Sequence, residues 1–158
     1  MSSENKSSPE ITIDLMSNDD LPEIMAIERE SFVSPWTMEM FREELANRYA
    51  QCLVMRIKYD QKTIIGAYII FRLIADEAHL HNLAVKSEFK RNGLAYSLME
   101  TMREIAGQMG ISVRTLEVRE SNKEAISLYR KCGFVVKGRR PLYYTDTKED
   151  ALIMWAGI

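Results

Sequence analysis

The stretch HNLAVKSEFKRNGLA, which runs from His81 to Ala95, decides the fold that we expect for this chain. It begins as an apolar strand, continues as a polar loop without proline, and ends where a glycine, Gly93, opens a long helix. Apolar residues recur along that helix at steps of three and four positions, which lines one helical face: Leu94, Leu98, Met102, Ile105 and Met109. A helix start presents unpaired backbone N–H groups and the positive end of the helix dipole, so the stretch predicts a site for phosphate.

Motifs that are absent from this stretch argue against some classes of phosphate-containing ligand. No Gly-Lys-Ser/Thr run follows the glycine, and the three-glycine spacing of dinucleotide-binding folds is absent, so ATP and NAD are disfavoured. Lys90 and Arg91 add positive charge just before Gly93. By itself, however, a single glycine at a helix start is more often a simple cap.

Outward from this stretch, the sequence predicts one α/β domain over residues 11–158, preceded by a mobile polar tail over residues 1–10. Alternating or apolar runs predict strands at 11–16, 50–59, 63–73, 78–85, 111–118 and 150–155, and another that starts at 134. Helical spacing predicts helices at 21–32, 38–45 and 93–109, and the capping box Ser121-x-x-Glu124 predicts a fourth.

Composition limits the kinds of partner. The 158 residues carry a net charge of −2, which excludes a chain that binds nucleic acid through overall positive charge. The first residues lack the apolar segment of a signal peptide, and the apolar runs are too short to span a bilayer, so we expect a cytoplasmic protein without membrane contact. Cys52 and Cys132 suit neither a disulfide framework nor a zinc site, so we expect two small buried side chains in a reducing compartment, and no metal.

Three side chains stand out as candidates for chemistry. Glu117 lies between two apolar residues of a predicted strand, so its carboxylate is either solvated on a sheet face or directed into a cleft. Tyr129 lies near the buried stripe of the following helix, where a tyrosine is usually a core residue. Glu28 falls on the apolar stripe of the first helix, where it either reaches solvent or faces a substrate groove.

Two segments together carry a family resemblance. Lys90-Arg-Asn-Gly-Leu-Ala95 resembles the acetyl-CoA motif Gln/Arg-x-x-Gly-x-Gly/Ala of the GNAT (GCN5-related N-acetyltransferase) superfamily, and Asn122-x-x-Ala125-x-x-Leu128-Tyr129-x-x-x-Gly133-Phe134 resembles its second signature. Lys90 departs from the usual Gln or Arg but keeps the positive charge. A narrower resemblance, which includes the segments 27–36, 76–85 and 140–144, is to the bacterial RimI family of ribosomal-protein alanine N-acetyltransferases.

The resemblance implies a GNAT fold, with a mixed central sheet of about seven strands that splays between strands four and five and carries helices on both faces. It also implies acetyl-CoA as co-substrate. The backbone of Leu83, Ala84 and Val85 would pair with the pantetheine arm, and Asn122 would hydrogen-bond that arm. The residues implied for the pyrophosphate are Lys90, Arg91, Asn92, Gly93, Leu94 and Ala95.

The same resemblance implies direct transfer of an acetyl group to an amine in a ternary complex. Glu117 would be the general base, acting through water, and Tyr129 the general acid that protonates the leaving thiolate. The partner implied is the N-terminal segment of a small-subunit ribosomal protein that begins with alanine. Its groove would be formed by Phe32, Pro35, Trp36, Tyr143 and Tyr144, with the two adjacent tyrosines facing opposite ways.

Several alternatives stay open at this point. The same scaffold could acetylate lysine or a small amine, or could bind acyl-CoA without catalysis, although Glu117 and Tyr129 together disfavour the last of these. Pro35 and Trp36 suit a packed loop as well as a substrate contact, and Arg139 and Arg140 suit a solvated turn as well as a groove entrance. An acetylated cysteine near Tyr129 is conceivable but has no evident base, and the sequence does not indicate an oligomeric state.

Overall fold

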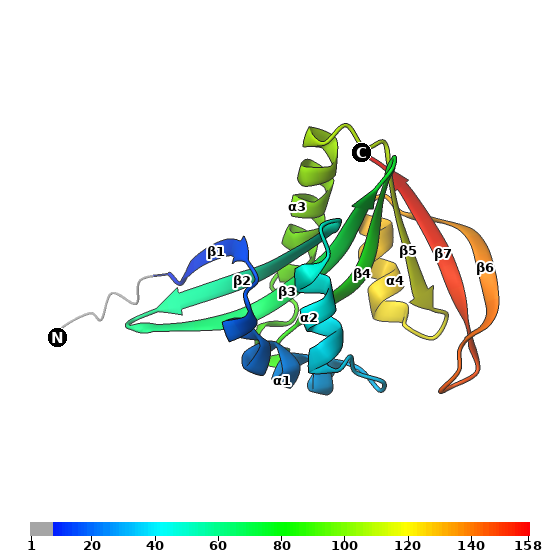
Figure 1. The fold of residues 1–158 in the computed structure, drawn as a ribbon. Coiled ribbons are helices and arrows are strands. Elements are labelled where there is room, and N and C mark those ends of the chain that lie inside the picture. Colours follow the sequence, from blue (N-terminus) through cyan, green and yellow to red (C-terminus); the bar gives the residue numbers. More distant parts are fainter. Residues whose placement is uncertain (1–7) are drawn as a thin grey trace.

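The computed structural model describes residues 8–158, which Figure 1 shows arranged around one seven-stranded sheet of order β1-β2-β3-β4-β5-β7-β6. Its strands are β1 (Glu10–Leu15), β2 (Ala50–Tyr59), β3 (Lys62–Ile74), β4 (Glu77–Val85), β5 (Val113–Arg119), β6 (Val135–Tyr144) and β7 (Glu149–Gly157). Its helices are α1 (Leu21–Ser31), α2 (Met38–Ala46), α3 (Leu94–Gln108) and α4 (Lys123–Lys131), with short 3-10 helices η1 (Asn18–Asp20) and η2 (Ser87–Phe89). The predicted order of elements and the mixed α/β fold class are both confirmed.

Residues 1–7 of the predicted tail lie outside the described residues. The last residue of that predicted tail, Glu10, belongs to β1. From residue 8 onward, no helix has the length and apolarity that a membrane crossing requires.

Two hydrophobic cores lie on opposite faces of the sheet. On one face α1 and α2 pack mainly against β2, β3 and β4, where Ile24, Phe41 and Tyr68 are fully buried. On the other face α3 and α4 pack against the sheet, and Leu98 and Leu116 belong to this second core. Figure 1 shows α1 and α2 beside β2 and β3, and α4 near β5 at the other end of the sheet. We call the two layers the α1/α2 core and the α3/α4 core.

β4 and β5 form a parallel pair that is joined at one end of the seam. Pairing is confined to Glu77–His79 of β4 and Val113–Thr115 of β5, after which the strands diverge. The predicted splay between the fourth and fifth strands is therefore present, and it leaves the later part of β4 without a neighbour on that side.

A bulge in β4 reverses which side chains face each core. The register with β3 shifts between Ile70 and Phe71, so that His81 has no partner. Ala78 and Leu80, before the bulge, point into the α3/α4 core, but Ala84, beyond it, belongs to the α1/α2 core. One extra residue has this effect because side chains alternate along a strand.

Two local predictions are wrong. α4 is not opened by a capping box at Ser121, because Asn122 is the N-cap and its side chain accepts from the Ala125 N–H at 3.1 Å. Met109 does not join the buried face of α3, because the helix ends at Gln108 and leaves Met109 67% exposed.

Candidate active site

The free edge of β4 lies where the sheet opens. The Lys86 N–H donates to the Gly66 carbonyl on β3 at 2.8 Å. Because hydrogen-bonded pairs alternate along an antiparallel ladder, the backbone groups of Ala84 face β3, whereas those of Leu83 and Val85 face the opened seam. The predicted backbone site therefore suits Leu83 and Val85, but Ala84 has its backbone groups directed the other way.

The loop between β4 and α3 has an unusual backbone. Arg91 and Gly93 both adopt positive φ angles, 63° and 78°. The Asn92 side-chain amide donates to the carbonyls of Phe89 and Lys90, both at 3.1 Å, which holds the loop in shape. The positive φ of Gly93 explains why a glycine stands at this position, because L side chains rarely adopt it.

The first turn of α3 offers free donors beside this loop. Gly93 is the N-cap and provides no side chain to cap the helix, so the N–H groups of Leu94 and Ala95 have no capping partner among the described residues. Lys90 and Arg91 are exposed next to them. The predicted phosphate site thus has both backbone donors and positive charge.

Glu117 lies on β5 just beyond the last residue that pairs with β4. Its Oε2 lies 2.8 Å from His79 Nε2, and its Oε1 lies 3.6 Å from an Arg140 guanidinium nitrogen. The hydrogen bond from His79 lowers the pKa of Glu117 and outweighs the opposing effect of burial, so the carboxylate is ionised near neutral pH. The side chain is 15% exposed, which leaves it open to a ligand.

Tyr129 lies on α4 inside the α3/α4 core, with its ring centroid 6.0 Å from that of Phe134. Burial raises the pKa of Tyr129, so the phenol keeps its proton at neutral pH. Among residues 8–158 no hydrogen bond to this hydroxyl is present, and the phenol proton is free for a ligand.

Glu117 and Tyr129 lie on opposite faces of the sheet. Leu116 and Val118 point into the α3/α4 core, so Glu117 between them faces the other side. Tyr129 approaches from the α3/α4 side. The sheet therefore has a carboxylate on one face and a buried phenol on the other.

Asn122 has one function that the sequence did not predict. Its side-chain oxygen caps α4 through the Ala125 N–H. The oxygen is therefore occupied, and the side-chain NH2 group is what remains to contact a cofactor.

The loop between α1 and α2 is held in place by a buried carboxylate. Glu28 is 1% exposed and accepts hydrogen bonds from the Trp36 N–H at 3.0 Å, the Asn82 side-chain amide at 3.0 Å and the Tyr68 hydroxyl. Both predictions for Glu28 are therefore wrong, because it reaches neither solvent nor a groove. Trp36 packs against Phe41 with ring centroids 5.1 Å apart, whereas Pro35 is exposed.

The same loop touches the turn between β6 and β7. The Ser34 hydroxyl donates to Asp146 at 2.7 Å, and Arg119 at the end of β5 binds the same carboxylate at 2.7 and 2.8 Å. These bonds bring two distant segments together beside the end of β5. Phe32, at the end of α1, is half-buried against the α1/α2 core.

Tyr143 and Tyr144 do not face opposite ways. Their ring centroids are 5.1 Å apart in a T-shaped contact, because Leu142 has a φ of 51° and the register of β6 breaks before Tyr144. Arg119 lies over the Tyr144 ring at 4.1 Å, and Arg140 lies 5.7 Å from the Tyr143 centroid. Both rings therefore border the Glu117 side of the sheet.

The structure separates the two adjacent arginines. Arg139 binds Glu120 at 2.8 Å and Asp150 at 3.0 Å, away from Glu117. Arg140 approaches Glu117 and is the one that belongs to the site. Their alternation along β6 explains the difference.

Sequence reasoning missed His79, which makes the closest contact to Glu117. The available signal was the pair His79 and His81, two positions apart on one strand, which indicates a polar strip on a sheet face. Their rings lie 4.9 Å apart. What the sequence did not reveal was that β5 brings Glu117 next to that strip.

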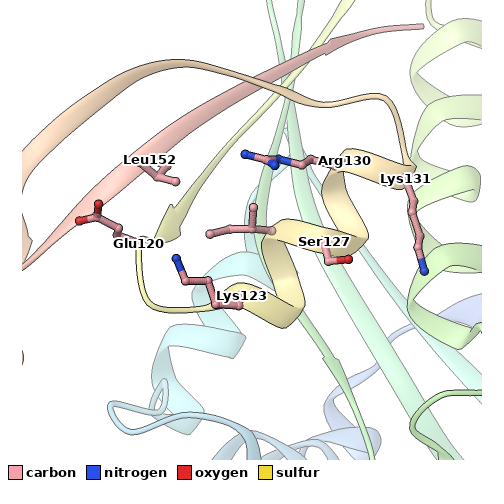
Figure 2. Close-up of a pocket in the computed structure, with 7 residues that line it drawn as sticks. Glu120, Lys123, Ser127, Arg130, Lys131 and Leu152 are labelled. Atoms are coloured by element: carbon pink, nitrogen blue, oxygen red, sulfur yellow. The ribbon is translucent and has the colours of Figure 1, made fainter.

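Two cavities open on the described surface, and neither Glu117 nor Tyr129 lines either of them. Figure 2 shows the larger, of about 600 Å³, where α4 residues stand across from Leu152 of β7. It is lined by Glu120, Lys123, Ile126, Ser127, Arg130, Lys131 and Leu152. The second, of about 440 Å³, is lined by Arg72, Ile74, Ala75, Asp76, Glu77, His79, His81 and Val113, so it reaches the histidine that binds Glu117.

The fold and the arrangement of the site are those of an acyltransferase. Residues 21–134 match the acetyltransferase (GNAT) family, and the chain belongs to that family. A putative [ribosomal protein bS18]-alanine N-acetyltransferase of Bacillus subtilis is 37% identical over 141 residues, which cover 89% of this chain and 91% of the relative. The [ribosomal protein bS18]-alanine N-acetyltransferase of Escherichia coli K12 is 34% identical over 145 residues, which cover 90% of this chain and 95% of the relative.

A solved structure agrees with these relatives. The crystal structure of the ribosomal-protein-S18-alanine N-acetyltransferase from Escherichia coli superposes with a TM-score of 0.83 at 32% identity and covers 94% of each chain. The resemblance inferred from the two sequence motifs is therefore confirmed over nearly the whole chain.

Proposed function

We propose that this protein transfers the acetyl group of acetyl-CoA to the α-amino group of an N-terminal alanine, and that its substrate is the ribosomal protein bS18 of its own cell. The observation that carries the proposal is the opened β4–β5 seam, which has free backbone groups of β4 along one edge and Glu117 beside it. The relatives support the choice of substrate, because the two compared above are named for this reaction. The cytoplasm is where such a substrate is made.

The residues present fit acetyl-CoA. The uncapped first turn of α3, with Lys90 and Arg91 beside it, suits a pyrophosphate. A Cβ built at Gly93 would meet nothing within 4 Å, so the space next to the loop is open to a ligand. The backbone groups of Leu83 and Val85 suit the amides of an extended pantetheine arm, which would bind as a strand does.

Val85 has a second role in this proposal. Its N–H faces the opened seam, where it donates to the thioester oxygen as negative charge develops there. A backbone donor on a strand is fixed before the reaction, so it does not reorganise when the charge appears.

Glu117 removes the proton that the attacking amine loses, directly or through a water molecule. An α-amino group has a pKa near 8, so roughly a tenth of it is neutral at pH 7 and the base has less to do than for a lysine. The lowered pKa of Glu117 keeps it ionised and ready to accept a proton. Positioned proton transfer of this kind contributes about 100- to 10,000-fold.

Tyr129 supplies a proton to the leaving thiolate from the opposite face of the sheet. The amine therefore enters on the Glu117 face and the thiol leaves on the Tyr129 face, which suits direct transfer in a ternary complex. Cys132 is buried, and burial raises the pKa of its thiol, which argues against an acetylated cysteine.

The peptide would reach Glu117 between the α1–α2 loop and the β6–β7 turn. Trp36, Tyr143 and Tyr144 border that approach, and the bond between Ser34 and Asp146 ties its two sides together. A chain end fits such an approach more easily than an internal lysine, because its backbone continues in one direction only.

A panel of acceptors tests the proposal. We would measure acetyl transfer from acetyl-CoA to hexapeptides that begin with Ala, Ser, Met and Gly, to an N-terminally blocked peptide with one internal lysine, and to spermidine. We expect the alanine peptide to have the highest kcat/KM. Faster transfer to the lysine peptide or to spermidine would replace the proposed substrate class with another amine.

A further inference from the structure

A chain of four side chains crosses the paired end of the β4–β5 seam. Glu117 contacts His79 Nε2 at 2.8 Å, and His79 Nδ1 lies 2.7 Å from the Thr115 hydroxyl oxygen. The Thr115 hydroxyl in turn donates to Glu77. His79 and Thr115 face each other in the last paired position, so the chain is built on the most regular part of the seam.

The direction of these hydrogen bonds fixes where the protons are on His79. Since Thr115 donates its one proton to Glu77, its oxygen is left to accept from Nδ1–H. Since Glu117 is ionised and can only accept, Nε2 must also carry a proton. Both ring nitrogens donate, so the network favours the imidazolium form.

The charges around His79 agree with this assignment. The hydrogen bond to Glu117 raises the pKa of His79, with a smaller contribution from Glu77, whose oxygen lies 3.5 Å from Nδ1. His81, the neighbouring ring on β4, has its pKa lowered, first by burial and then by the charge of His79. Other charged groups face the cluster from three elements: Arg72 on β3, Glu44 on α2 and Arg140 on β6.

We propose that His79 is a positioning residue for Glu117: held as an imidazolium by its hydrogen bonds to Thr115 and Glu117, it fixes the orientation of the Glu117 carboxylate and keeps it ionised for the attacking amine. This inference rests on the proposed role of Glu117 as general base. His79 does not touch the reacting atoms, and it acts through the carboxylate.

The second cavity gives solvent access to His79 that does not lead through the proposed substrate site. His79 and Glu77 both line this space of about 440 Å³. Part of the imidazole is therefore accessible to water from this cavity. The same exposure makes the state of His79 depend on pH.

Imidazole NMR tests the contact without any assay of activity. The chain has two histidines, so two sets of ring signals can be assigned with one variant. We expect His79 to titrate above 6.5 and His81 below it, because the shifts have opposite directions. Glu117→Gln and Thr115→Val should each lower the pKa at which His79 titrates. Both variants should still give the NMR spectrum of a folded protein. A His79 that titrates below His81, or that does not respond to Glu117→Gln, would overturn the proposal.

Kinetics then tests the consequence. We expect His79→Leu to lower kcat roughly tenfold, a part of what a positioned base contributes, with the KM for acetyl-CoA unchanged. The acid limb of kcat/KM should move to higher pH, because Glu117 loses its cationic partner. His79→Gln keeps an N–H donor for Glu117 but has no positive charge. Its kcat should therefore lie between those of His79→Leu and the wild type, while the acid limb of kcat/KM should stay at the higher pH.

His81→Phe is the matched control. It removes the other histidine of the same cavity and keeps an aromatic ring, so we expect a wild-type pH profile. A pH profile of His79→Leu that coincides with that of the wild type would mean that His79 only packs. If the wild type acetylates no peptide in the panel, the proposed function fails, while the NMR experiment still decides whether His79 and Glu117 are linked.

Discussion

Glu28 and Glu117 are both carboxylates at the sheet, but their surroundings differ. Glu28 is 1% exposed, and its three donors are neutral groups of the protein: a backbone N–H, a phenol and an amide. Glu117 is 15% exposed and is paired with His79 and Arg140 beside an opened seam. We call these surroundings the closed region and the open region.

The difference shows what makes a carboxylate available for chemistry. In the closed region the hydrogen bonds of Glu28 all come from the fold itself, so Glu28 locks the α1–α2 loop. In the open region the contacts orient Glu117 and leave part of it free. Burial by itself therefore does not identify the proposed catalytic group, because the more buried glutamate is the structural one.

The largest effect that we expect is on turnover in the open region. Glu117→Gln should lower kcat by about 100- to 10,000-fold at pH 7, because it removes the proton acceptor and keeps the shape. The deficit should shrink as pH rises, since more of the amine becomes neutral unaided. Steady-state kinetics from pH 6 to 9 measures this, with Glu120→Gln as a control that removes a carboxylate outside the site. An unaltered kcat would make Glu117 a plain sheet residue.

The closed region should respond in stability. Glu28→Ala should reduce the free energy of unfolding by about 3 kcal/mol, because it leaves a cavity and buried donors without partners. Urea denaturation measures the loss. Glu28→Gln, which keeps the volume, should lose less. If Glu28→Ala were as stable as the wild type, the lock on the α1–α2 loop would not exist.

Two tyrosines extend the contrast. Tyr129→Phe in the open region should lower kcat roughly tenfold or more with little change in either KM, the pattern of an interaction made mainly in the transition state. Its melting temperature should change little, because no partner of the hydroxyl is present within residues 8–158. Tyr68→Phe in the closed region should do the reverse and lose about 1 kcal/mol with the hydrogen bond to Glu28. Unimpaired turnover in Tyr129→Phe would leave water to protonate the thiolate.

Two glycines separate cofactor binding from backbone strain. Gly93 and Gly110 have φ angles of 78° and 73°, and a Cβ at either would meet nothing within 4 Å. Gly93→Val and Gly110→Val should therefore lose similar stability, about 1–2 kcal/mol from strain. Gly93→Val alone should weaken CoA binding, by about tenfold, because its side chain would occupy the open space beside the start of α3 where the pyrophosphate is proposed to bind. Calorimetric titration with CoA measures this, and equal affinities for the two variants would remove that helix start from the site.

The smallest effect concerns pH and stability in the open region. Glu117 has a lowered pKa, so its contribution is present above its ordinary value of 4.5 and is lost as pH falls through the folded value. His79 has a raised pKa, so its contribution is present below 6.5 and is lost as pH rises through the folded value. The pair should therefore stabilise the protein by roughly 1 kcal/mol between those two limits.

Thermal unfolding of the wild type and of Glu117→Gln checks this contribution. We expect the difference in melting temperature to be largest near pH 6 and to narrow toward pH 9. A difference that stays constant over that range would show that the ion pair adds no stability.

Much of this protein followed from local sequence. The apolar steps from Leu94 to Met102 predicted the buried face of α3, and Gly93 predicted its start, because helix geometry and a positive φ are properties of a few neighbouring residues. The order of strands and helices followed in the same way. The second of the two motifs contains Tyr129, and the family resemblance implied the role of Glu117, although the chemistry of both stays a proposal until the kinetics are measured.

Tertiary structure alone decided what surrounds those residues. The early end of β4–β5 pairing and the bulge at His81 depend on how strands meet, and no local pattern records them. For the same reason the sequence left Glu28 either in solvent or facing a groove, whereas the fold places Tyr68 and Asn82 on its oxygens. His79 gave no sign of its role until β5 placed Glu117 beside it. Periodicity fixes the face on which a side chain lies, whereas its partners depend on chain segments that are far apart in sequence and meet only in the folded sheet.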